Sequence, residues 1–101
     1  MALQAAFIFV APGADSSKDR SAVVTPGVEL TVVGVKDYQE ATQVAAELVT
    51  KGVLAIELCG GFGIEGVAAI KKAVQGKAVV GVVRFDNHPG LDFKSGDELF
   101  L

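Results

Sequence analysis

Two short clusters of polar residues and glycines carry most of the side chains in this sequence that could do chemistry. Residues 57–62 (Glu-Leu-Cys-Gly-Gly-Phe) end one apolar run, and residues 84–88 (Arg-Phe-Asp-Asn-His) end the next. A thiol beside an imidazole could act as a nucleophile and its base, and a glycine turn before a helix could hold a phosphate. Since α/β sheets bind ligands at the carboxyl ends of their strands, we expect the site where these two clusters lie.

Glycine spacing suggests a nucleotide site, but its surroundings favour another interpretation. Gly61, Gly63 and Gly66 match G-x-G-x-x-G, and Asp86 follows Gly66 by 20 residues, as in a dinucleotide-binding fingerprint. Against this, Glu65 puts a negative charge in the first helical turn, and 101 residues are too few for two mononucleotide-binding halves. We favour the interpretation that these glycines form a tight turn and let a ligand or another backbone approach closely. A nucleotide- or phosphate-binding module stays an alternative.

Two charged residues, Glu57 and Arg84, lie inside the apolar strands, where a charged side chain needs a partner. Glu57 and Arg84 could form an ion pair across neighbouring strands, or could anchor a ligand in an apolar cavity. Cys59 is interpreted mainly as a small apolar filler, although a small enzyme that uses Cys59 or His88 stays a second alternative. One histidine and one cysteine show no metal-ligand spacing, so we expect no metal and no cofactor. The candidate ligand-binding residues are Glu57, Cys59, Gly60, Gly61, Phe62, Arg84, Asp86, Asn87 and His88.

The hydrophobic pattern predicts a single α/β domain over residues 1–101 that positions these clusters. Asp37 should cap the first helix, with Glu40 completing a capping box, and Gly52 should end it. Two right-handed βαβ units imply a mostly parallel sheet with both helices on one face. We expect the sheet to be strongly curved, even barrel-like, and a tail from residue 87 to pack on it or on a partner subunit. The predicted strands are 4–11, 21–25, 28–35, 53–59 and 78–85, and the predicted helices are 38–51 and 64–75.

Composition narrows the functional classes. The net charge is −3 with a pI of about 5.0, and no basic stripe occurs, so nucleic acid is not an expected partner. The apolar run 5–10 is too short for a membrane span and lacks the charged start of a signal peptide. A single cysteine fits the cytoplasm. Half of the residues are apolar, with a mean hydropathy of +0.46, and such an apolar excess on a small domain usually goes into a subunit interface or a binding cavity. We therefore expect a homodimer.

Residues 27–35, 57–63 and 83–90 resemble a family of small, mostly uncharacterised bacterial proteins of about this length. That family is similar to the tiancimycin-binding self-resistance proteins, and the resemblance covers nearly the whole chain in length and segment order. It implies a barrel-like protein that sequesters an anthraquinone-fused enediyne, or a similar polycyclic aromatic, and so confers antibiotic resistance without catalysis. The expected function is therefore non-enzymatic binding of a small molecule.

Overall fold

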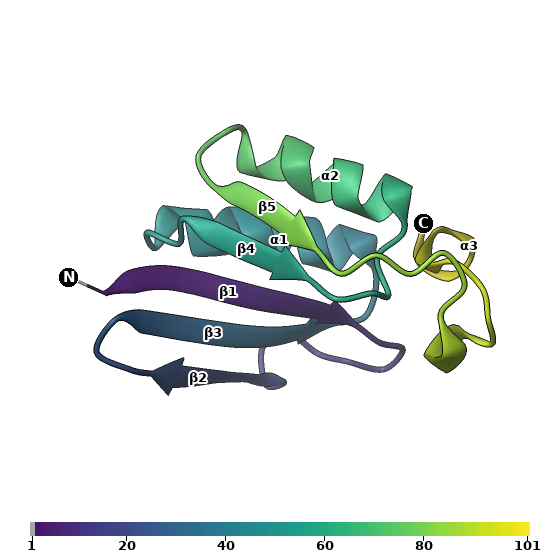
Figure 1. The fold of residues 1–101 in the computed structure, drawn as a ribbon, viewed down its shortest axis with the longest axis horizontal. Coiled ribbons are helices and arrows are strands. Elements are labelled where there is room, and N and C mark those ends of the chain that lie inside the picture. Colours follow the sequence, from purple (N-terminus) through teal and green to yellow (C-terminus); the bar gives the residue numbers. More distant parts are fainter. Residues whose placement is uncertain (1) are drawn as a thin grey trace.

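The computed structural model describes residues 2–101 as an α/β domain built on a five-stranded sheet (Figure 1). The strand order is β2-β3-β1-β4-β5. Four strands run parallel, and β2 is antiparallel to β3 at one edge. The α/β class and the mostly parallel sheet are thus confirmed. The strands are β1 (Leu3–Val10), β2 (Arg20–Val24), β3 (Val28–Val35), β4 (Ala55–Leu58) and β5 (Val79–Val82).

The expectation of a barrel-like sheet is wrong. Closure would require the two edge strands, β2 and β5, to pair with each other. They stand at opposite ends of the strand order, and no bridge joins them within residues 2–101. The sheet therefore stays open, with two edges.

Both long helices cover the same face of the sheet (Figure 1). Helix α1 (Tyr38–Thr50) connects β3 to β4 and passes over β1, whereas α2 (Ile64–Val74) connects β4 to β5. Asp37 caps α1 as predicted, because its carboxylate accepts a hydrogen bond from the Glu40 backbone N at 2.8 Å. Glu40 does not complete the capping box. Its carboxylate accepts instead from the Lys36 backbone N at 2.7 Å, one residue before the cap.

Strand β1 is apolar on both faces, but the chain covers only one of them. Alternation along the strand turns Ala6, Ile8 and Val10 toward the helices, where all three are buried. Phe7 and Phe9 point to the opposite side and are only partly buried. We call this side the open face. Its strand residues, by register, are Leu3, Ala5, Phe7, Phe9, Ser21, Val23, Val28, Leu30, Val32, Gly34, Ala55, Glu57, Val79 and Gly81.

The C-terminal segment packs at the carboxyl edge rather than on the open face. After β5 it passes through a 3-10 turn, η1 (Pro89–Leu91), to the short helix α3 (Gly96–Phe100). Phe100 is buried against Tyr38, with ring centroids 6.2 Å apart. The segment therefore packs against the helical layer, which corrects the expectation that it would cover the sheet.

Candidate ligand site

The two polar clusters meet at the carboxyl edge, as the sequence predicts. Strands β4 and β5 are neighbours, and Leu58 lies opposite Val82. The Phe85 ring then lies directly on Gly60, where an added Cβ would be only 2.0 Å from a ring carbon. Phe85 also contacts His88, with ring centroids 4.6 Å apart. Gly60, Phe85 and His88 thus form one contiguous group.

Glu57 and Arg84 do not form a pair. The register sets Glu57 opposite Gly81, whereas Arg84 lies two residues beyond the end of β5 at Val82. Arg84 instead donates from Nε to the Asp86 carboxylate at 2.8 Å. Both side chains of that pair are substantially exposed, so the ion pair adds little to stability. Glu57 is exposed on the open face and needs no protein partner, because water solvates it.

Cys59 and His88 both serve local turns. The Cys59 Sγ accepts a hydrogen bond from the Gly61 backbone N at 3.3 Å. The His88 Nδ1 accepts from the Gly90 backbone N at 2.9 Å and so caps η1. Within residues 2–101 no hydrogen bond joins the thiol to the imidazole. Asn87, the residue before His88 and another member of the predicted site, is exposed.

Phe62 lies in the core and leaves the candidate site. Its side chain is completely buried, and its ring stacks on Tyr38 with centroids 5.5 Å apart. The turn after β4 drives this ring under α1, so no surface of it is open to a ligand. Gly61 is likewise buried, against Val10 and the Cys59 sulfur.

The anion-binding end of α2 is occupied by the chain's own Asp97, a residue that the sequence analysis missed. The Asp97 carboxylate accepts from the backbone N of Glu65 at 3.0 Å and of Gly66 at 3.3 Å. The Tyr38 hydroxyl donates to the same carboxylate at 2.9 Å, and accepts from the Gly63 backbone N at 2.9 Å. Burial, together with that bond to a carboxylate, raises the pKa of Tyr38.

The glycines of the motif make room for these contacts. A Cβ at Gly63 would lie 2.4 Å from the Asp97 carboxyl carbon, and one at Gly66 would lie 2.5 Å from the Tyr38 ring. A Cβ at Gly96 would lie 1.7 Å from the Gly61 carbonyl oxygen. The motif glycines Gly63 and Gly66 thus leave room for the Asp97 and Tyr38 side chains, and Gly96, outside the motif, leaves room for the Gly61 backbone. The amides that a pyrophosphate would use are already bound to a carboxylate.

A hollow of about 330 Å³ lies on the open face, away from the predicted cluster. Phe9 and Val32 supply its apolar lining, and Lys18, Asp19, Arg20 and Ser21 complete it. Ligand sites typically combine such an apolar lining with a few polar groups. The sequence did signal this region, because β1 is continuously apolar, but that pattern alone does not say that one face stays uncovered.

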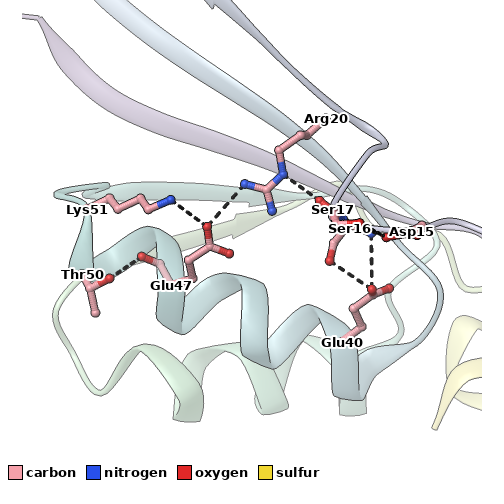
Figure 2. A network of polar contacts seen from close by, with 8 residues as sticks. All are labelled: Asp15, Ser16, Ser17, Arg20, Glu40, Glu47, Thr50 and Lys51. Carbon is pink, nitrogen blue, oxygen red and sulfur yellow. Dashed lines mark hydrogen bonds and ion pairs between the residues drawn. The ribbon is translucent and has the colours of Figure 1, made fainter.

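Hydrogen bonds and an ion pair tie the segment before β2 to α1 (Figure 2). Glu40 accepts from Ser16, at 3.0 Å from its hydroxyl and 3.3 Å from its backbone N. Arg20 donates to the Ser16 carbonyl at 2.6 Å and lies 3.4 Å from Glu47, which also pairs with Lys51. The bond from the Lys36 backbone, followed by those from Ser16, lowers the pKa of Glu40. Of the polar residues that line the hollow, Arg20 is therefore tied to α1.

These features define a small two-layer α/β protein with an open, mostly parallel sheet, helices on one face and an uncovered apolar face. The chain belongs to the family described as "Family of unknown function (DUF6506)", whose model matches residues 3–98. The expectation of a small uncharacterised family is thus confirmed, and the match contains no link to tiancimycin-binding proteins.

Searches of curated proteins and of solved structures returned no match. Across residues 2–101, no helix has the length and apolarity to cross a bilayer. The same part of the chain holds no group of three or more His, Cys, Asp or Glu side chains placed to bind a metal ion.

Proposed function

We propose that this protein binds a flat, apolar small molecule on the open face and does not transform it. The observation that carries the proposal is the hollow lined by Phe9 and Val32. The Phe9 ring packs directly on Gly34, where an added Cβ would lie 2.6 Å from a ring carbon. An aromatic ring packed on the sheet in this way gives a ligand a contact surface at a small cost in side-chain entropy.

A polycyclic aromatic is the ligand class that fits this surface best. Aromatic rings pack well against rings in offset or edge-to-face arrangements. The narrower version of the proposal, antibiotic resistance by sequestration of an anthraquinone-fused enediyne, rests on the resemblance of the sequence segments alone.

The two alternatives have less support. An enzyme that used the thiol and the imidazole together would need them in contact, and within residues 2–101 no hydrogen bond joins them, since Cys59 Sγ and His88 Nδ1 each accept from a backbone N of a local turn. A nucleotide-binding module would need the amides at the start of α2, which Asp97 occupies. Neither alternative explains why an apolar hollow lies on the open face.

A thermal-shift and fluorescence titration tests the proposal. The probes are anthraquinone-2-sulfonate, an anthraquinone-fused enediyne, NAD and sugar phosphates. We expect saturable stabilisation by the aromatic probes, reaching about 2.7 kcal/mol at a ligand concentration of 100 Kd. Phe9→Leu should weaken binding about tenfold, whereas Phe93→Leu, at an exposed phenylalanine outside the hollow, should not. No saturable binding of any aromatic probe would refute the proposal, and stabilisation by NAD alone would favour the nucleotide alternative.

A further inference from the structure

The open face is built like an interior surface. Parallel sheets normally have both faces covered, and their strands are then continuously apolar, as β1 is over residues 5–10. Here the helices cover one face only (Figure 1). On the open face Val23 is 57% exposed and Val79 is 71% exposed. Glu57 is the one charged side chain that the strands place there.

We infer that a second copy of this chain packs its open face against this one, so that two sheets lie face to face. A stable interface removes about 800 Å² from each partner, about one seventh of the 5738 Å² of surface on this chain. One broad face of a two-layer domain offers about this fraction of the surface of the chain. Its centre, formed by Phe7, Phe9 and Leu30, has the apolar and aromatic character of an interface core.

The charges on the open face are arranged to complement a second copy. Glu57 lies on β4, to one side of the central strand β1. On the other side, toward β2, the hollow is lined by two cationic side chains, Lys18 and Arg20, and one anionic side chain, Asp19. A two-fold axis along β1 would stack Phe7 near its counterpart. It would also bring Glu57 of each protomer to the side where its partner carries Lys18. An isologous interface requires such a self-complementary pattern, and opposite charges at the rim help to set its register.

This interface does not depend on the proposed ligand, although it would enclose the hollow. Sedimentation equilibrium of the full chain between about 1 and 100 µM tests it, since specific dimers commonly dissociate in or below this range. We expect the mass to approach twice 10.4 kDa. Val23→Lys should raise the dimer dissociation constant at least about tenfold, because it buries an unpaired charge. Val24→Lys is the matched control, because Val24 is 70% exposed on the same strand but points to the other face.

A charge exchange separates a true interface from damage to the fold. Glu57→Lys and Lys18→Glu should each weaken the dimer, and the double variant should restore it, since these residues meet only between copies. A mass of 10.4 kDa at every concentration would overturn the inference, as would equal effects of the two valine variants or failure of the double variant to restore association. A monomer that still binds anthraquinone through Phe9 would overturn the dimer but leave the proposed function standing. A dimer that binds no aromatic probe would overturn the proposed function but leave the dimer standing.

Discussion

Replacing Asp97 by asparagine tests whether one carboxylate holds the C-terminal segment on the domain. That carboxylate accepts from Tyr38 and from two backbone amides at the start of α2. Asparagine keeps the shape but loses the charge, and its NH₂ group then faces an amide donor. A hydrogen bond to a charged group contributes about 1.5–3 kcal/mol, and a negative charge at a helix N-terminus about 0.3–1 kcal/mol. We therefore expect a loss of about 2 kcal/mol from a domain whose total stability is about 5–15 kcal/mol.

For a domain of this size, 2 kcal/mol corresponds to a fall in Tm of about 8–16 °C. Calorimetry measures the Tm, and limited proteolysis reports whether the segment from residue 83 onward opens. Glu98→Gln is the matched control, because it removes the same charge from the same helix and keeps a side-chain acceptor for the Ser95 backbone N. If the two variants have Tm values within about 2 °C of each other, less than the effect of 1 kcal/mol, the reasoning about Asp97 is refuted.

Three further predictions follow from single contacts. The pKa of Tyr38 is raised in the folded state, so Tyr38 ionises first in the unfolded chain, and the free energy of unfolding should fall as the pH rises above about 10. Tyr38→Phe should remove this loss. Because Tyr38 is the one tyrosine of the chain, its phenolate absorbance reports its ionisation directly. The pKa of Glu40 is lowered in the folded state, chiefly by the Lys36 backbone N–H. Its contribution to stability is therefore present above the unfolded pKa of about 4.3 and is lost as the pH falls through the folded pKa. Glu40→Gln should flatten the acid arm of a plot of unfolding free energy against pH, and an unchanged arm would contradict this. Gly96→Ala should cost about 1–3 kcal/mol in urea denaturation, because its Cβ would overlap a backbone carbonyl, whereas Gly27→Ala, with open space around it, should cost much less.

Local sequence signals predicted the elements well, because those signals depend on near neighbours. The Asp37 cap is present, and Gly52 and Gly76 follow the two helices with φ angles of +96° and +74°. Strand ends were predicted less well. β4 and β5 each have four residues, fewer than their apolar runs suggested, because only residues with a partner in the ladder count as strand.

The position of the two polar clusters was predicted, whereas their use as a ligand site stays a prediction. The two clusters do lie at one edge, since the carboxyl ends of neighbouring parallel strands must meet there. Their internal arrangement was beyond local reasoning. The Glu57–Arg84 pair does not form because β5 ends at Val82, before Arg84, and the Arg84 guanidinium pairs with Asp86 instead. Phe62 is buried because the turn after β4 sends its ring under Tyr38, which is 24 residues earlier in the chain.

The sequence by itself determined the α/β class, the five strands, the two long helices and the glycine turn, because capping, periodicity and turn chemistry act between residues a few positions apart. The tertiary structure decided which strand lies at the centre, which face of the sheet stays open and what occupies the start of α2. The contact of Asp97 with Gly66 spans 31 residues, and that of Tyr38 with Asp97 spans 59. Such contacts depend on the positions of whole elements, and these are fixed only when the sheet and its helices pack together.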